Sequence, residues 1–333
     1  MEAITKNRQT TEVLRAMVAR AFGDAQVPDG QASDGQGWVE ELSDGYFNVA
    51  YQLRLRDGQR VVLKIAPSPE VEVMAYEQGM MANEVRALTL IRERTGVPVP
   101  AVLFYDPSCE LCDADYFFMD FVDGDNLATI GDTLPPREYQ AYTEAVGAAN
   151  LALNQIKGAH FGPLLGGDPG ATWREVFTGL VESVLRDGER RDVALGVGYD
   201  AVREVMVRSA GSLDDVTEPV FVEWDLWNGN VLVRDGEIAG IIDHERALYG
   251  DPLMENGFVA TSMEGIGDPT GFVRGYGRTP TTPAEITRRR LYTLYLLLIM
   301  TIETVYREFP DSEQYDWSRT WLLRLMELFD RDR

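Results

Sequence analysis

Alternating apolar and polar residues in the first third of the chain predict an antiparallel sheet. Apolar side chains recur at every second position over residues 49–55, and a similar run follows over residues 61–65. Between the two runs, the Asp-Gly pair at residues 57–58 favours a tight hairpin turn. Residues 99–105 and 116–122 are two further runs typical of strands. We therefore expect the N-terminal part of the chain to be rich in strands that form an antiparallel sheet.

Helical periodicity follows the hairpin and dominates the remainder of the chain. Met81, Val85 and Leu88 lie on one face of an expected helix, and a longer stripe of the same period covers residues 173–185. The longest apolar run, residues 291–302, is flanked by charged residues and is too short to span a bilayer. It therefore predicts a buried core helix.

Strands followed by helices predict an α+β protein with two lobes. The 333 residues suit two domains, since one domain takes roughly 150 residues. We expect an N-terminal lobe over residues 1–122, with an antiparallel sheet and one helix. A mainly helical C-terminal lobe, with one β-hairpin, is expected over residues 123–333.

The charge balance excludes some classes of partner. The chain has 31 lysines and arginines against 54 aspartates and glutamates, a formal charge of −23. Such an excess opposes phosphate backbones and anionic lipid surfaces, so neither a nucleic acid nor a membrane is expected as a partner. The first residues lack the pattern of a signal peptide, which favours the cytoplasm. A monomer and a homodimer both fit the sequence.

Cysteine and histidine are scarce. Cys109 and Cys112 are the only cysteines, so a disulfide framework is excluded, and a single Cys-x-x-Cys pair is weak evidence for a metal or redox site. The two histidines, His160 and His244, leave little material for a Ser-His-Asp triad or a histidine-rich metal site.

A second hairpin is expected inside the helical half. Residues 231–233 and 238–242 are strand-like and are separated by an Asp-Gly turn. Asn230 precedes the first strand and Asp243 follows the second, and an antiparallel hairpin places both at the same end. Their oxygens suit Mg²⁺ bound together with substrate phosphates. Each residue alone would also fit a polar loop with a structural role.

Asp225 adds a third oxygen group to this pattern. It lies five positions before Asn230, in a loop that follows an apolar run at residues 219–222. An aspartate, four residues, an asparagine, a hairpin and another aspartate are typical of a phosphotransfer site. Such a site has one carboxylate to orient a hydroxyl and two metal ligands.

The N-terminal half supplies a candidate phosphate anchor. Lys64 is one of only three lysines and lies in the middle of an expected strand, and Glu84 on the next helix is its expected partner. Ser43 and Gly45 lie in a turn between two strands, whose backbone amides would suit phosphates. The turn has one glycine and would also fit a plain hairpin. The sequence lacks the motifs of P-loop and dinucleotide-binding proteins.

Taken together, these segments resemble the aminoglycoside phosphotransferase family of small-molecule kinases, which shares the protein-kinase fold. The similarity extends from about residue 40 to residue 258. It is carried, in chain order, by Lys64, Glu84, residues 118–122, Asp225, Asn230, Asp243 and residues 250–252. The order and spacing of these pieces are more specific than any one of them.

The resemblance implies an ATP-dependent kinase that uses Mg²⁺. On its nucleotide side, Lys64 would contact the α- and β-phosphates, Glu84 would hold Lys64, and the main chain of Asp120 and Val122 would bind adenine. On the catalytic side, Asn230 and Asp243 would hold Mg²⁺, while Asp225 would be the catalytic residue that orients the attacking hydroxyl.

Three positions depart from the family pattern. Family members commonly have histidine and glycine immediately before the catalytic aspartate, where this chain has Glu223 and Trp224. An aromatic residue usually follows the metal-binding aspartate, where this chain has His244. An inactive nucleotide-binding regulatory module is therefore the alternative to a working kinase. A hydrolase is less favoured, because no nucleophile is evident.

The acceptor is expected to be a small polar molecule with a hydroxyl group: an aminoglycoside or other antibiotic, a sugar or an amino alcohol. A role in antibiotic resistance would fit the first of these. The candidates for binding the acceptor are Glu223, Trp227, Glu245 and Glu255. A glutamate that faces the cleft without a partner would indicate a cationic acceptor, and Trp227 could stack on a sugar ring. Asp251 is expected to cap a helix.

Overall fold

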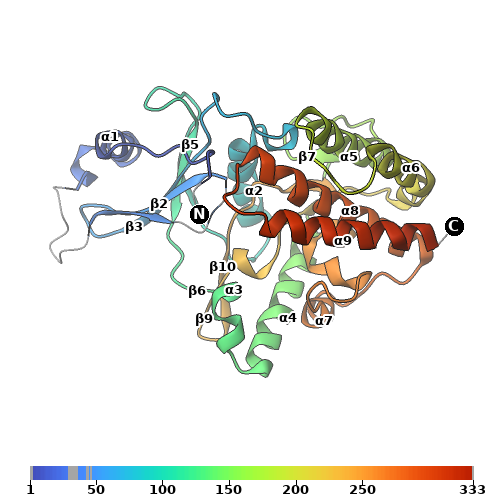
Figure 1. Cartoon of the computed structure of the whole chain (residues 1–333). Helices are drawn as coiled ribbons and strands as arrows, with labels where there is room; N and C mark the ends of the chain where they lie inside the picture. The colour runs from blue at the N-terminus through green and yellow to red at the C-terminus, as the bar shows by residue number, and fades with distance from the viewer. Residues whose placement is uncertain (1–2, 29–36, 43–44, 46, 332–333) are drawn as a thin grey trace.

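The computed structural model describes residues 3–28, 37–42, 45 and 47–331 and shows two lobes. A sheet with two helices forms the N-terminal lobe, and most of the remaining helices form the C-terminal lobe (Figure 1). The helix α2 lies between the sheet and the helical lobe (Figure 1). The predicted two-lobed α+β fold is therefore confirmed.

The N-terminal sheet has five strands, and all of its neighbouring strands are antiparallel, in the order β1-β2-β3-β5-β4. Its strands are β1 (Val39–Leu42), β2 (Val49–Arg54), β3 (Arg60–Ile65), β4 (Val102–Asp106) and β5 (Tyr116–Asp120). The predicted hairpin is formed by β2 and β3, which begin their pairing at Arg54 and Arg60 on either side of the Asp-Gly turn.

Two helices cover opposite faces of this sheet. On one face, α1 (Thr11–Phe22) packs through Leu14 and Met17 in a core that includes Leu63. On the other face, α2 (Met80–Arg94) shares a core with Val62. Because side chains alternate along a strand, Lys64 lies on the same face as Val62, toward α2. The sequence pattern indicated α2 but not α1.

Between the lobes the chain changes from one sheet to another. The strand β5 ends at Asp120, and the next strand, β6 (Asp125–Asn126), pairs with β9 (Val231–Arg234) instead of the N-terminal sheet. In turn β9 pairs with β10 (Glu237–Ile241), which confirms the second predicted hairpin. The division expected at residue 122 falls between these two sheets.

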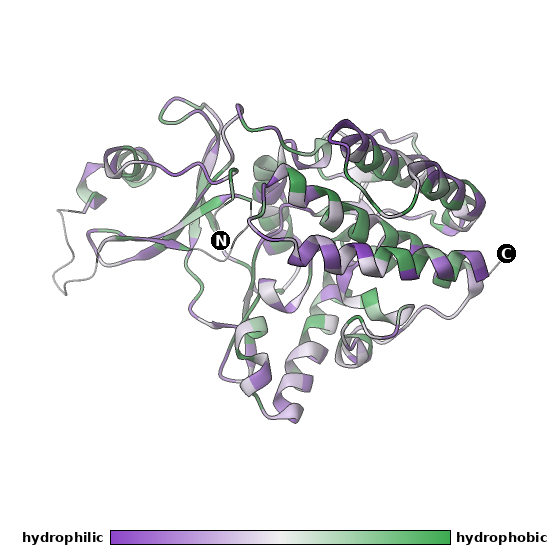
Figure 2. Cartoon of the chain, viewed as in Figure 1, coloured by the Kyte–Doolittle hydropathy of each residue, from purple (hydrophilic) through white to green (hydrophobic). Residues whose placement is uncertain are grey.

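The C-terminal lobe is built around a buried helix. Its helices are α3 (Leu127–Ile130), α4 (Pro136–Leu153), α5 (Trp173–Arg190), α6 (Tyr199–Ser209), α7 (Thr270–Tyr276), α8 (Pro283–Tyr306) and α9 (Glu313–Arg331). A third small sheet joins β7 (Gly162–Pro163), β11 (Leu248–Gly250) and β8 (Val220–Val222). Most of α8 is buried, as the apolar run predicted, and Figure 2 shows hydrophobic residues concentrated along it. In the part of the chain that the structure describes, no helix combines the length and the apolar character needed to cross a membrane.

Candidate active site

Lys64 is held between two carboxylates. Its Nζ atom donates hydrogen bonds to both oxygens of Glu84, at 2.8 and 2.6 Å, and to Oδ1 of Asp243 at 2.7 Å. Burial alone would lower the pKa of Lys64, but the negative charges of Asp243 and Glu84 outweigh burial and raise it. Lys64 is therefore a permanently charged ammonium at the junction of the lobes.

Asn230 and Asp243 meet at one end of the β9–β10 hairpin. The main-chain N–H of Ile242 donates to the carbonyl oxygen of Asn230 at 2.9 Å, which joins the two ends. Asp243 then leaves the strand with a φ of 67°, a left-handed conformation that few residues other than glycine adopt. The carboxylate of Asp243 is turned in this way toward Lys64 of the other lobe.

Asp225 lies beside these two residues. The side-chain amide nitrogen of Asn230 donates to the main-chain oxygen of Asp225 at 3.0 Å, and Nε of Arg246 lies 3.9 Å from its Oδ2. Burial raises the pKa of Asp225 to about 6, with Arg246 opposing and Asp243 adding to the shift. Asp225 is only 20% exposed, so this carboxylate has limited access to water.

An acidic cluster surrounds Lys64. Among the described residues, one group of three or more aspartate, glutamate, histidine and cysteine side chains could share a cation: Glu84, Asp243 and Glu245, whose ligand atoms lie within 4.8 Å of one another. Burial and the charge of Asp243 raise the pKa of Glu245 to about 8. Carboxylate and amide oxygens are hard donors, so the chemistry of Asp243 and its neighbour Asn230 fits Mg²⁺. Cys109 and Cys112 are free thiols outside this cluster.

The candidate adenine-binding segment connects the lobes. Asp120 is the last residue of β5, and its carboxylate accepts a hydrogen bond from the main-chain N–H of Ala101 at 3.3 Å. The side chain of Val122 packs on Gly240 of β10, where a Cβ atom would lie only 2.9 Å from it. Both residues therefore lie where the chain passes from one lobe to the other.

The candidate phosphate turn is described only in part. Ser43 lies outside the described residues. A Cβ atom on Gly45 would lie 3.6 Å from Nζ of Lys6, which donates to the carbonyl oxygen of Asn48 at 2.9 Å. The side chain of Asn48 in turn donates to Oε2 of Glu245 at 2.6 Å. Gly45 therefore lies at the edge of the same acidic cluster.

Two of the candidate acceptor-binding glutamates are not available to an acceptor. Glu255 is fully buried, and its carboxylate accepts hydrogen bonds from the main-chain N–H groups of Trp224, Leu226 and Asn256 at 3.1, 3.0 and 2.8 Å. Glu223 is 1% exposed and is paired with a buried histidine at 2.6 Å. The condition for an ammonium site, an unpartnered carboxylate facing the cleft, is not met at either residue. Their expected place in an acceptor pocket is therefore corrected.

The remaining candidates differ in exposure. Glu245 is buried and bonded to Asn48, so it too has a partner. Trp227 is 48% exposed, and its ring covers Gly229 so closely that a Cβ atom there would lie 2.2 Å from it. Trp227 is therefore the most exposed of the four candidate acceptor-binding residues. Asp251 caps the short helix Pro252–Met254 and also binds Arg288, which gives it a structural place.

Arg246 is a site residue that the sequence analysis missed. Its guanidinium group lies over the rings of Trp224 and Tyr76, 5.4 and 5.6 Å from their centroids, and its Nη2 atom contacts Glu303 at 3.4 Å. The only signal was its position three residues after Asp243. Asn48 was also missed, because its partner is 197 positions away.

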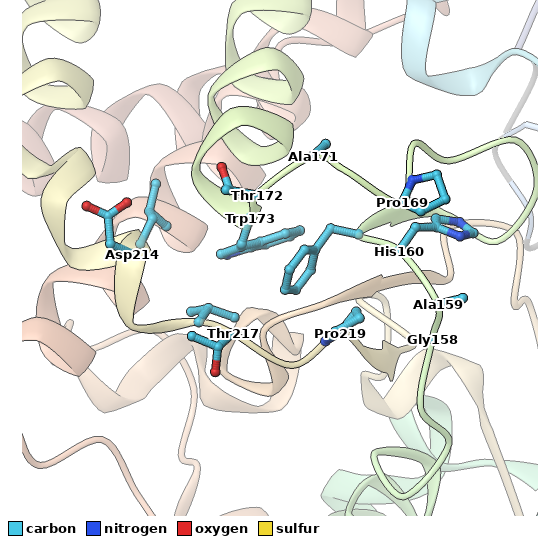
Figure 3. A pocket seen from close by; sticks show the side chains of 13 residues that line it. Gly158, Ala159, His160, Pro169, Ala171, Thr172, Trp173, Asp214, Thr217 and Pro219 are labelled. Atoms are coloured by element: carbon cyan, nitrogen blue, oxygen red, sulfur yellow. The ribbon is translucent and has the colours of Figure 1, made fainter.

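Two hollows lie away from these residues. The first, of 470 Å³, is bordered by the start of α5, and Figure 3 shows Trp173 in its middle, with His160 and Asp214 on opposite sides. A second, of 590 Å³, lies between Phe47 and the segment 66–81. Neither is lined by Lys64, Asp225 or Asp243.

A two-lobed fold, with a lysine-glutamate pair in the sheet lobe and Asp225, Asn230 and Asp243 close together in the helical lobe, is the arrangement of a kinase-type phosphotransferase. The chain belongs to the phosphotransferase enzyme family, whose model matches residues 38–292. The resemblance to aminoglycoside phosphotransferases is therefore confirmed.

Solved structures share the fold at low sequence identity. A protein of Thermobifida fusca described as a candidate fructosamine-3-kinase is 20% identical, with a TM-score of 0.68 over 97% of this chain and 100% of its own. A thermostable mutant of aminoglycoside phosphotransferase APH(4)-Ia, in a ternary complex with AMP-PNP and hygromycin B, is 19% identical, with a TM-score of 0.66 over 96% of this chain and 98% of its own. Identities in this range establish the fold alone.

Curated relatives match a shorter segment. Two subtelomeric hrmA-associated cluster proteins from strains of Aspergillus fumigatus are 30% identical over 92 residues. This segment covers 27% of the chain and 17% of each relative's length.

Proposed function

We propose that this protein is an ATP-dependent kinase that transfers the γ-phosphoryl group to a hydroxyl of a small polar molecule. The observation that carries the proposal is the position of Lys64, whose ammonium group lies between Glu84 of its own lobe and Asp243 of the other. A fixed positive charge next to a cation-binding carboxylate suits a triphosphate, whose transfer depends mainly on positioning and charge neutralisation.

On the nucleotide side, the proposed roles follow the two lobes. Lys64 would contact the α- and β-phosphates, and Glu84 would keep its ammonium group in place. The main chain of Asp120 and Val122, where the lobes join, would bind adenine. A nucleotide in this position is supported by the related fold of APH(4)-Ia, which has been solved with AMP-PNP and with ADP.

On the catalytic side, Asn230 and Asp243 would hold Mg²⁺. Magnesium, when bound, would neutralise charge that develops on the phosphates. Asp225 would accept a hydrogen bond from the acceptor hydroxyl and align it for attack, because its main chain is bonded to Asn230 and its carboxyl group is close enough to Asp243 for their charges to interact. Lys64, Asn230, Asp243 and Asp225 are all present, which supports a working enzyme over an inactive module.

The acceptor would be a polyhydroxylated or amine-bearing small molecule. APH(4)-Ia has been solved with hygromycin B and APH(2″)-IIa with gentamicin, which supports an aminoglycoside, another antibiotic, a sugar or an amino alcohol as the class. Trp227 would stack on a ring of the acceptor with the exposed part of its side chain. We propose structural roles for Glu223 and Glu255, so a cationic acceptor no longer has support from these two residues.

The test is an acceptor screen that detects ADP release from MgATP. Turnover with at least one hydroxyl compound is expected, and Asp225→Asn should lower kcat by about 10²-fold or more while AMP-PNP still binds. Asp235→Asn is the matched control, because Asp235 is 90% exposed in the hairpin turn. Full activity of Asp225→Asn would contradict the assignment. Nucleotide binding without turnover across a broad panel would favour the regulatory module.

A further inference from the structure

Glu223 and His244 form a buried pair beside the proposed catalytic centre. The Nδ1 atom of His244 lies 2.6 Å from Oε2 of Glu223, and its Nε2 atom lies 3.0 Å from the main-chain oxygen of Ile241. The two side chains are 0% and 1% exposed. Each ring nitrogen of His244 therefore has its own hydrogen-bond partner, which fixes the orientation of the imidazole from both sides.

Stability alone does not explain this buried polar pair. Burying polar side chains is costly, and apolar residues of similar size are often as stable in such places. The second oxygen of Glu223, Oε1, is buried without a hydrogen-bond partner among the described residues. His244 is therefore the partner that holds the Glu223 side chain, and the orientation of each side chain is fixed by the other.

The pair joins the two segments that carry the catalytic groups. Glu223 directly follows β8 and lies two positions before Asp225, whereas His244 directly follows Asp243. Trp224 and Asp243 both have a positive φ, 64° and 67°, so the backbone beside each member of the pair is strained. A strained backbone persists only where surrounding contacts hold it in place.

These are also two of the three positions that depart from the family pattern. The family commonly has histidine where this chain has Glu223, and an aromatic residue where it has His244. In the structure these two side chains contact each other. The histidine of this chain therefore lies after Asp243, and the residue that it contacts occupies the position where the family commonly has histidine.

Resting on the proposed function, we propose that Glu223 and His244 act as a positioning pair that fixes Asp225 relative to Asp243. The pair touches neither nucleotide nor acceptor. It acts by joining the end of β8 to the end of β10, so that the hydroxyl-orienting carboxylate and the metal-binding carboxylate stay in register.

A double-mutant cycle tests the pair. Glu223→Gln keeps the shape and removes the charge, and His244→Phe keeps a ring and removes both donors. Each single variant should lower kcat about 10- to 100-fold, the usual cost of losing a partner of a metal ligand. At saturating Mg²⁺ the KM for ATP should change by less than about threefold, because Glu84 still holds Lys64 and the adenine-binding segment is untouched. The kcat of the double variant should be no lower than the kcat of the less active single variant.

The controls separate positioning from folding. His160→Phe changes the chain's only other histidine, which is half-buried and bonded to the oxygen of Pro163, and it should leave kcat unchanged. Circular dichroism should show that each variant is folded at the assay temperature. If His244→Phe does not fold, His244→Gln takes its place in the cycle. A merely structural role would lower the melting temperature without changing kcat of the folded enzyme.

A second readout does not need turnover. The Mg²⁺ concentration that gives half-maximal AMP-PNP binding, measured by calorimetry, should rise about tenfold or more in both single variants because Asp243 is displaced. If the protein shows no turnover but this Mg²⁺ concentration still rises in the variants, the positioning role of the pair stands and the proposed kinase function is overturned. Singles with normal kcat and normal Mg²⁺ dependence, or losses that multiply in the double variant, would overturn the pair.

Discussion

The ionisation of Asp225 should control the rate at acidic pH. Burial raises the pKa of Asp225 to about 6, and the group must be a carboxylate to accept a hydrogen bond from the acceptor hydroxyl. Activity is therefore present above this pKa and is lost as the pH falls through it. We expect kcat/KM to decline about tenfold per pH unit below pH 6 and to be level above pH 7.

The measurement is the pH profile of kcat/KM between pH 4.5 and 8, with AMP-PNP binding followed over the same range. Binding should stay nearly constant while turnover falls, because Lys64 keeps its charge throughout. A level rate profile across this range would show that Asp225 does not have the expected role.

Arg246 should determine the pH at which kcat/KM falls on the acidic side of the profile, here called the acidic limb. Its positive charge, 3.9 Å from Asp225, lowers the pKa of this carboxyl group against the effect of burial. Arg246→Met removes the charge, so the limb should move to higher pH by about one unit, as for a short contact between opposite charges. Arg234→Met is the control, because Arg234 is an exposed arginine of the nearby hairpin. An unshifted limb in Arg246→Met would contradict this prediction.

At the scale of elements, local patterns were predictable and distant partners were not. The β9–β10 hairpin follows from alternation and an Asp-Gly turn, so the meeting of Asn230 and Asp243 could be read from adjacent residues. Glu255 was misplaced because a carboxylate near the site in sequence reveals nothing about its donors. Trp224 has a positive φ and lies in the loop whose N–H groups donate to Glu255. No sequence motif predicts that conformation at a tryptophan, so these donors could not be predicted.

The crossing of α4 and α7 depends on glycine. A Cβ atom on Gly275 would lie 1.7 Å from the main-chain oxygen of Glu144, and one on Gly147 would lie 2.0 Å from that of Phe272. The two helices therefore touch backbone to backbone. Gly275→Ala should lower the free energy of unfolding by about 3 kcal/mol, the upper end for overpacking, because neither backbone can move alone.

Gly179 provides the matched control for this prediction. It lies in the exposed face of α5, and a Cβ atom there would meet nothing within 4 Å. Gly179→Ala should raise stability by about 0.5–1 kcal/mol, because alanine loses less backbone freedom on folding. Urea unfolding followed by circular dichroism measures both variants. Equal effects of the two substitutions would show that the helices can separate at no cost.

At the scale of the whole molecule, the lobes are joined by more than the chain between β5 and β6. The segment between β3 and α2 contacts the helical lobe through two charged groups. Glu72 pairs with Arg190, the last residue of α5, and with Arg191 immediately after it, and Glu77 accepts a hydrogen bond from Arg307 at 2.7 Å. The sequence predicted each lobe but none of these contacts, because they depend on how two separately formed surfaces meet. Because Lys64 and Asp243 belong to different lobes, these contacts help to hold the two residues at a fixed distance from each other.

The buried pair of Glu77 and Arg307 should therefore contribute more to stability than surface pairs do. Arg307 also binds Glu303 at 3.0 Å, and all three side chains are no more than 6% exposed. Arg307→Met would leave buried Glu77 without its cation and Glu303 with Arg246 alone, so we expect a loss of about 3–5 kcal/mol in the free energy of unfolding. Arg186→Met, which breaks an exposed pair on α5, should cost only about 0.3–0.5 kcal/mol. The KM for ATP should also rise in Arg307→Met but not in Arg186→Met, because Lys64 would lose its fixed distance from Asp243. Similar urea midpoints for the two variants would show that the lobes are held together elsewhere.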